Sequence, residues 1–187
     1  EAFGLTTKTG IDLIGESNSI YYDAEGLGPT QLATSSFGQT FRVTPIQMIT
    51  AAAAVANGGY LVQPHVVSKV IDSEGNIVMT NDTTVKRQVI SEETSRRVSA
   101  MLQETATTGT AKNGYVAGYR VAGKTGTTDD SVDQWFVGVT PYYVGVCWLG
   151  YDSRYKTDEA GNIQYNKYGV AIPNSIRYSS YPPPKIW

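Results

Sequence analysis

The chain of 187 residues is long enough to form one domain with a buried core. Hydrophobic residues make up 41% of the chain and charged residues 17%, a composition that excludes a disordered tail or a fibre. The net charge of −2 gives no basic field for a polyanion, so we expect no nucleic acid as a partner.

No apolar run approaches the ~20 residues of a membrane-spanning helix. The chain starts at Glu1 without an initiating methionine or a signal peptide, and we expect it to be a trimmed piece. A membrane is therefore expected as a partner only through a segment absent from this chain.

The first 43 residues are rich in Gly, Thr and Ser and predict mostly loop. Thr44-Pro45-Ile46-Gln47 then supplies a capping threonine, a proline at the first helical position and a glutamine that can reach back to the cap. We expect a helix to begin there, to be buried on several sides and to end at Asn57-Gly58-Gly59, because paired glycines favour a left-handed cap.

Residues 66–71 and 77–79 predict two short strands joined by a hairpin loop. Ser91 is expected to cap a second helix that ends near Gly109, with Val98, Met101 and Leu102 on one apolar face. Residues 44–114 are thus predicted to hold two helices and a hairpin.

Three strands are predicted next, at 115–127, 134–139 and 142–151, as an antiparallel meander. Both faces of the last strand are apolar, so we expect it to be covered on both sides. Residues 152–187 predict an irregular excursion and an extended, proline-rich tail. Residues 1–187 together predict a partial domain of the α+β class, an antiparallel sheet with packed helices.

Lys124-Thr125-Gly126-Thr127 places a cation, two hydroxyls and a bare backbone along one of these strands. Lysine can hold a carboxylate or lower the pKa of a nucleophile, the hydroxyls can bind a carboxylate, and glycine lets a substrate approach. A backbone N–H near the strand end can also stabilise an oxyanion. The tripeptide alone is weak evidence, because Lys8-Thr9-Gly10 is a second copy.

The wider context resembles the penicillin-binding transpeptidases, whose motif set includes K-T-G. The match runs over about residues 3–151. It follows an ordered series of motifs: Lys8-Thr9-Gly10-Ile11-Asp12-Leu13, Ser36-Phe37-Gly38-Gln39, Val43-Thr44-Pro45-Ile46-Gln47, Ala56-Asn57-Gly58-Gly59, Gly109-Thr110-Ala111, Val121-Ala122-Gly123-Lys124-Thr125-Gly126-Thr127-Thr128 and Gln134-Trp135-Phe136-Val137-Gly138. The resemblance implies the C-terminal portion of a serine β-lactamase/transpeptidase-like fold.

The resemblance also implies roles for single residues. Lys124 would take part in catalysis through the polar network of the nucleophile and would recognise the substrate carboxylate. Thr125 and Thr127 would hydrogen-bond that carboxylate, and the backbone N–H of Thr127 would form half of the oxyanion hole. Gly126 would keep the substrate-binding strand clear, whereas Lys8 would belong to a connecting segment.

This sequence departs from the family pattern in its serine motifs. No S-x-x-K and no S-x-N precedes Lys124. Ser153-Arg154-Tyr155-Lys156 fits by letter but follows the strand and lacks helix-start signals, so chance spacing explains it better. We therefore expect this chain to lack the nucleophilic serine and to be inactive alone.

The parent protein is expected to be a serine-type D,D-transpeptidase that cross-links peptidoglycan stem peptides through an acyl-serine and reacts with β-lactams. The resemblance favours the class B enzymes over class A and places the domain at the extracellular face of the bacterial cytoplasmic membrane. A non-catalytic binding or scaffolding module of the same fold is one alternative. A β-lactam sensor or β-lactamase relative is another.

The other candidate residues favour structural roles, and no cofactor or metal is expected. His65 has no cysteine or histidine partner for a metal. Asp129, Asp130 and Asp133 lack the glycine and glutamate of a calcium loop and are read as a solvated loop. Cys147 is expected to pack as a small apolar side chain, and Trp135 and Trp148 as core or groove wall.

Overall fold

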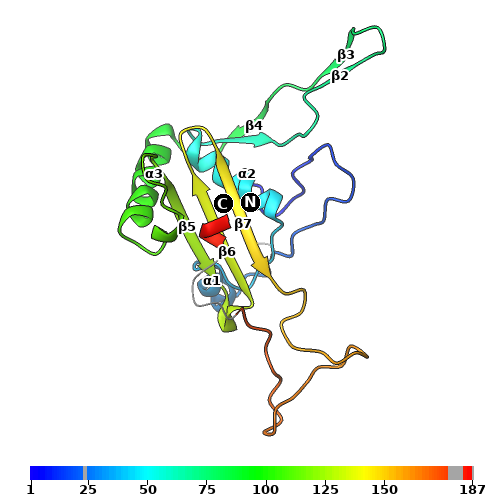
Figure 1. Ribbon diagram of the computed structural model, residues 1–187, viewed down its shortest axis with the longest axis vertical. Coiled ribbons are helices and arrows are strands. Elements are labelled where there is room, and N and C mark those ends of the chain that lie inside the picture. Colours follow the sequence, from blue (N-terminus) through cyan, green and yellow to red (C-terminus); the bar gives the residue numbers. More distant parts are fainter. Residues whose placement is uncertain (23–24, 177–182, 187) are drawn as a thin grey trace. The chain divides into compact units, whose positions relative to one another are not determined.

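The computed structural model describes residues 1–22, 25–176 and 183–186 (Figure 1). The chain divides into two compact units, Glu1–Met101 and Leu102–Trp187. The elements are mixed helices and antiparallel strands, which confirms the α+β class. Within the described residues, no helix combines the length and the apolar character needed to span a membrane.

In the first unit, helix α2 spans Pro45–Ala56 and has the predicted capping box. The Thr44 backbone N–H donates to Gln47 Oε1 at 2.9 Å, and the Gln47 N–H donates back to Thr44 Oγ1 at 3.3 Å. The helix is at least half-buried on several sides, as expected, since Pro45 is its one exposed residue. The fully buried positions, at the spacing of one helical stripe, are Gln47, Thr50, Ala51 and Ala54.

Helix α2 ends at the paired glycines, as predicted. Gly58 and Gly59 both have left-handed φ values, +94° and +97°. At Gly59 a side chain is also excluded by space, because a Cβ would lie 1.9 Å from the carbonyl oxygen of Ile90. The chain then enters strand β1, Tyr60–Gln63, which pairs antiparallel with β4, Thr84–Gln88.

The predicted hairpin is confirmed as β2, Lys69–Ile71, and β3, Ile77–Thr80. Its turn is held by Asp72, whose Oδ1 accepts from the N–H of Glu74 at 2.9 Å and of Asn76 at 2.8 Å. Residues 66–68 lie before the strand. Helix α1, Pro29–Ser35, lies within the segment expected to be mostly loop.

Helix α3 spans Glu92–Thr107 and begins as predicted, with Ser91 Oγ accepting from the Thr94 N–H at 3.2 Å. Of its expected apolar face, Val98 and Leu102 are half-buried, whereas Met101 is not buried. Met101 is 66% exposed, and the fully buried residues of the helix are Ser95 and Ala106. The small Ala106 is buried because it lies in the core cluster with Phe136.

The second unit is built on a three-stranded antiparallel sheet in the order β5–β6–β7, which confirms the meander (Figure 1). The strands are Ala122–Thr127, Asp133–Val139 and Val144–Gly150. A strand was expected from residue 115, but residues 115–121 are not in a strand. They follow the 3₁₀ turn η1, Lys112–Gly114, and contain hydrogen-bonded turns. The core cluster on this sheet consists of Ala106, Ala111, Val121 and Phe136.

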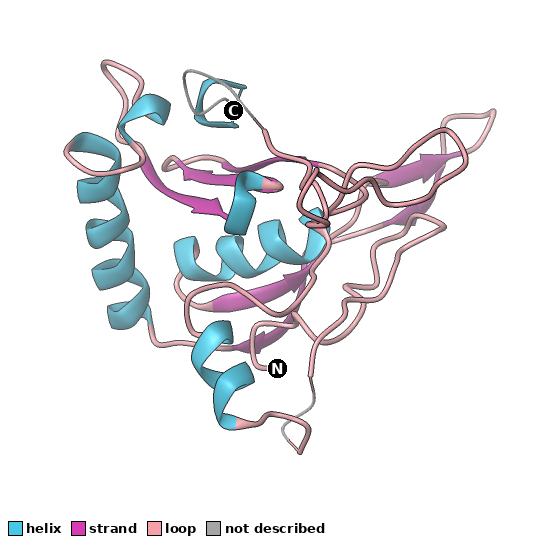
Figure 2. Cartoon of the chain, turned by 90° about the horizontal axis from the view of Figure 1, so that it is seen from below, coloured by secondary structure: helices cyan, strands magenta, loops and turns pink. Residues whose placement is uncertain are grey.

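Two further expectations for this unit are corrected. No residue of β7 is fully buried, and Trp148 is 41% exposed, so the strand is not covered on both sides. The tail is not wholly extended, since Pro183–Ile186 forms the short helix α4 (Figure 2). Residues 152–176 are irregular, as predicted, with isolated bridges only, while 177–182 and 187 lie outside the described residues.

Candidate active site

Lys124, Thr125, Gly126 and Thr127 are the last four of the six residues of β5. Among the described residues, β6 is the only strand paired with β5, so β5 is an edge strand there. Successive side chains of a strand point to opposite faces. Thr125 and Thr127 therefore share one face of the sheet, and Lys124 and Gly126 share the other.

The backbone N–H of Thr127 points away from β6. The N–H of Thr128 donates to the carbonyl oxygen of Asp133 at 3.1 Å, which fixes the phase of the ladder. Because hydrogen-bonded and non-hydrogen-bonded pairs alternate in antiparallel strands, the Thr127–Gln134 pair is a non-hydrogen-bonded one. The N–H groups of Thr125 and Thr127 thus face the open edge of the sheet.

One further contact fits this phase. Lys124 Nζ donates to the carbonyl oxygen of Thr125 at 2.7 Å, which that carbonyl can accept because it also faces the open edge. Lys124 is exposed, and its ammonium is within reach of an anion placed along the strand. At Gly126 a Cβ would lie 3.4 Å from Trp135 Cβ, an ordinary van der Waals contact.

The turn after α3 is tied to the outer edge of β5. Thr105 Oγ1 donates to the carbonyl oxygen of Gly123, and Thr125 Oγ1 donates to Thr110 Oγ1 at 3.1 Å. Glycine is needed at position 109, between Thr105 and Thr110, because a Cβ there would lie 2.8 Å from Thr105 Cα. The sequence contained Gly109-Thr110-Ala111 as a motif but gave no sign that Thr110 contacts Thr125.

Gln134 lies directly opposite Thr127 and is 7% exposed. In a non-hydrogen-bonded pair the two side chains approach closely, so its carboxamide lies on the same face as the Thr127 hydroxyl. Its Oε1 is the one buried side-chain polar atom of the described residues without a hydrogen-bond partner. Sequence analysis assigned Gln134 only to the neighbouring strand.

The loop between β5 and β6 contains the 3₁₀ turn η2, Asp129–Ser131. Asp130 has a left-handed φ of 60° and pairs with Arg154 at 3.3 Å, and Asp133 Oδ1 accepts from Trp148 Nε1 at 3.0 Å. The ring centroids of Trp135 and Trp148 lie 5.9 Å apart. Among the described residues, no group of three or more acidic, histidine or cysteine side chains forms a metal site.

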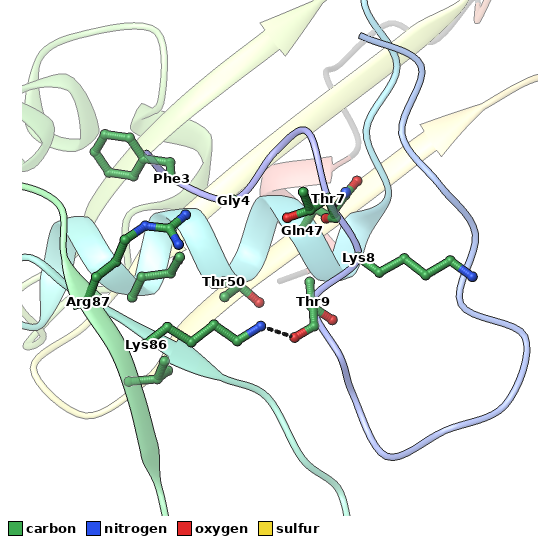
Figure 3. A pocket seen from close by; sticks show the side chains of 11 residues that line it. Phe3, Gly4, Thr7, Lys8, Thr9, Gln47, Thr50, Lys86 and Arg87 are labelled. Carbon is green, nitrogen blue, oxygen red and sulfur yellow. Dashed lines mark hydrogen bonds between the residues drawn. The ribbon is translucent and has the colours of Figure 1, made fainter. Parts of the chain in front are cut away.

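The first Lys-Thr-Gly segment differs sharply from the second. The Glu16 carboxylate accepts from the Thr9 N–H at 2.5 Å and from the Gly10 N–H at 3.0 Å, so these donors serve the fold. Figure 3 shows the Lys8 side chain extending away from the small pocket beside it. At that pocket Lys86 Nζ donates to the Thr9 carbonyl oxygen. This arrangement agrees with a connecting segment.

Ser153, which fits S-x-x-K by letter, lies in a loop and not at a helix start. Its Oγ donates to the Tyr155 carbonyl oxygen at 2.9 Å. Cys147 is half-buried, and this burial raises the pKa of its thiol, which disfavours the thiolate. His65 lies in a loop on the first unit, beside Asp12.

The model of the penicillin-binding protein transpeptidase domain family matches residues 1–163. The chain belongs to this family. Stage V sporulation protein D of Bacillus subtilis is 43% identical over 132 residues, which are 70% of this chain and 20% of that protein. Penicillin-binding protein 1A of Aquifex aeolicus is 40% identical over 62% of this chain and 16% of its own length.

Solved structures agree with the family. The D,D-transpeptidase domain of a peptidoglycan glycosyltransferase from Eggerthella lenta matches at 30% identity and a TM-score of 0.63, covering 75% of this chain and 38% of that one. Penicillin-binding protein 3 of Mycobacterium tuberculosis matches at 26% identity and a TM-score of 0.71, covering 80% and 38%. The chain spans about a fifth of the curated relatives it matches.

Proposed function

We propose that this chain is the substrate-binding part of a serine-type D,D-transpeptidase that cross-links peptidoglycan stem peptides. The observation that carries the proposal is the open edge of β5, where the N–H groups of Thr125 and Thr127 lie next to two hydroxyls and an ammonium. A peptide ending in a carboxylate can add to this edge as a further strand. The acyl group would then lie against the Thr127 N–H.

The last four residues of the strand have parts in this proposal. Lys124 and the hydroxyls of Thr125 and Thr127 bind the terminal carboxylate, because charge-assisted hydrogen bonds are the strong ones. The Thr127 N–H stabilises the oxyanion of the tetrahedral intermediate and is the reason for placing Thr127 among the catalytic residues with Lys124. Gly126 leaves room for the ligand backbone.

The acyl-serine step requires a nucleophile that this sequence does not hold before Lys124. We propose that the serine and its S-x-N partner belong to other parts of the parent protein. β-Lactams would bind the same edge, in the way of a relative whose structure was solved in complex with ampicillin, penicillin-binding protein 3 of Mycobacterium tuberculosis. The proposed location is the extracellular face of the cytoplasmic membrane.

The test is a titration of the ¹⁵N-labelled chain with an N-acyl-D-Ala-D-Ala peptide, followed by amide NMR shifts. We expect saturable shifts at Thr125 and Thr127, and roughly tenfold weaker binding for Thr125→Val, since a hydrogen bond to a charged group is lost. Thr84→Val, on exposed strand β4, is the matched control and should bind like the wild type. Shifts that are absent, or equal in Thr125→Val, would reject the proposal.

A non-catalytic module of the same fold is the second candidate, and the missing serine motifs favour it equally. The coding sequence upstream of Glu1 separates the two. An S-x-x-K followed by S-x-N supports the enzyme, whereas an unrelated domain supports the module. Assignment to class B stays a prediction, because the relatives include both a sporulation protein at 43% identity and a penicillin-binding protein 1A at 40%.

A further inference from the structure

A hydroxyl from outside the sheet contacts the proposed substrate-binding strand. Thr110 lies in the turn after α3, and its Oγ1 accepts from Thr125 Oγ1 at 3.1 Å. Thr110 is exposed, and among the described residues Thr125 is the one hydrogen-bond partner of its side chain. This hydroxyl therefore serves β5 and not the turn that carries it.

The position of Thr110 is fixed by its two neighbours. Gly109 packs on the end of α3, since a Cβ there would lie 2.8 Å from Thr105 Cα. Ala111 is fully buried in the core cluster with Phe136, and its N–H donates to the Thr105 carbonyl oxygen at 3.0 Å. None of these contacts involves the Thr110 hydroxyl, so this hydroxyl is placed beside β5 before any ligand binds.

The end of α3 also closes the outer edge of β5 before Thr125. Gly123, Thr125 and Thr127 alternate along the strand, so their N–H and carbonyl groups face the same edge. Gly123 is buried, and its carbonyl oxygen already accepts from Thr105 Oγ1. A ligand strand whose acyl group lies at Thr127 therefore finds the edge open as far as Thr125. In the proposed function this places the terminal carboxylate beside Thr125.

A hydroxyl has one hydrogen to donate, which limits what Thr125 can do alone. In the ligand-free chain this hydrogen points to Thr110. A carboxylate accepts hydrogen bonds and donates none, so Thr125 must turn its hydrogen toward the ligand. The Thr110 hydroxyl can then donate to Thr125 Oγ1, because a hydroxyl is both donor and acceptor. The two side chains stay in contact, and hydrogen bonds in such a chain strengthen one another.

We propose that Thr110 is a positioning residue of the substrate-binding strand. It holds the Thr125 hydroxyl in one rotamer at the outer edge and becomes the donor to that hydroxyl when a carboxylate binds. The inference rests on the proposed function, in which Thr125 binds the terminal carboxylate. Thr110 acts through Thr125 and not on the ligand itself.

A purely structural role for the Thr110 hydroxyl fits the contacts less well. The hydrogen bond between Thr110 and Thr125 is exposed, and such a bond stabilises a fold little because water replaces it. The turn is anchored by Gly109 and Ala111, whose contacts persist without the hydroxyl. Removal of the hydroxyl is therefore expected to weaken ligand binding and to leave the melting temperature unchanged.

The test is the N-acyl-D-Ala-D-Ala titration of the ¹⁵N-labelled chain, repeated with variants at position 110. We expect Thr110→Val to bind about threefold more weakly, the effect of one neutral hydrogen bond, and Thr110→Ser to bind like the wild type. Thr108→Val is the matched control, because Thr108 is also exposed and its hydroxyl bonds, among the described residues, only to Glu104. This control should keep the wild-type affinity.

A double-mutant cycle shows whether Thr110 acts through Thr125. Once Thr125→Val has removed the positioned hydroxyl, Thr110→Val should cause no further loss, so the double variant should bind like Thr125→Val alone. Independent losses that multiply would mean that Thr110 acts on the ligand directly and would overturn the positioning role. Wild-type affinity in Thr110→Val, or weakened binding in Thr110→Ser, would overturn it as well.

Side-chain rotamers in the ligand-free chain give a readout that does not depend on the dipeptide. Scalar couplings of Thr125 should report one χ1 rotamer in the wild type and in Thr110→Ser, and a mixture in Thr110→Val. If the wild type shows no dipeptide shifts, the proposed function fails, and the couplings alone decide whether Thr110 holds Thr125. If the wild type binds but Thr110→Val changes neither the affinity nor the couplings, the positioning role fails and the proposed function stands.

Discussion

Glycines in β5 serve two different purposes, although they stand only three positions apart. Gly123 is buried, and a Cβ there would lie 2.8 Å from the ring edge of Phe136 and 3.1 Å from the Val137 carbonyl oxygen. Gly126 is half-buried, and its nearest contact for a Cβ is at 3.4 Å. Gly123 thus lets the sheet pack closely on Phe136, whereas the proposed part of Gly126 is to keep the ligand edge clear.

Gly123→Ala is predicted to destabilise the chain by about 1–3 kcal/mol, the usual cost of overpacking a core. Thermal unfolding followed by circular dichroism should show a melting temperature lower by several degrees, at ~2–4 °C per kcal/mol for a chain of this size. Gly126→Ala is the matched control in the same strand and should lower it less. An equal effect of both substitutions would contradict the packing role of Gly123.

Gln134→Met is predicted to stabilise the chain. The Gln134 carboxamide oxygen is buried without a partner, and such a group costs about 1–3 kcal/mol, whereas methionine of similar size has no polar oxygen. We expect a higher urea midpoint at unchanged slope. A lower midpoint would mean that the carboxamide makes a stabilising hydrogen bond in solution.

At the scale of elements, local polar contacts decide where segments begin and end. The Asp72 turn holds the β2–β3 hairpin, and the hydrogen bonds to Thr44 fix the start of α2. The loop before α1 is held in the same way by Glu16, which accepts from the backbone and hydroxyl of Thr9 and from Gly10. Burial by itself raises the pKa of Glu16, but these hydrogen bonds outweigh it and lower the pKa below 4.5.

This shift predicts acid sensitivity of the Glu16 contact. A carboxyl with a lowered folded pKa stabilises the fold above its unfolded pKa, and the contribution is lost as the pH falls below 4.5 through the lowered value. Glu16→Gln should therefore show a smaller drop in urea midpoint than the wild type between neutral and acid pH. Parallel pH profiles for the two proteins would exclude Glu16 as a source of the dependence.

At the scale of the whole molecule, the chain carries the edge strand of the proposed site but no serine motif before it. We predict no covalent labelling of this chain by a fluorescent penicillin, measured by intact-mass spectrometry. A relative that contains the complete domain serves as the positive control for labelling. A stoichiometric adduct on this chain would identify Ser153 or another serine as a nucleophile and would reverse the assignment.

The sequence by itself determined the features that depend on neighbouring residues. The capping box at Thr44, the glycine end of α2 and the hairpin around Asp72 follow from contacts a few residues apart. The strand that contains Lys124 was indicated by its residue pattern, although it begins at Ala122 and not at Tyr115. The family resemblance supplied roles for Lys124, Thr125, Gly126 and Thr127, which remain proposals.

Only the tertiary structure decided the contacts between distant residues. Tyr60 pairs with Gln88, Thr125 bonds Thr110, and the buried Gln134 lies opposite Thr127. Strand β1 has four residues, which are too few for an alternation of apolar and polar residues to indicate a strand, and its pairing with β4 could not be predicted. Met101 has the right spacing for the core face of α3 but is exposed, because burial depends on what packs against a helix and not on its period alone.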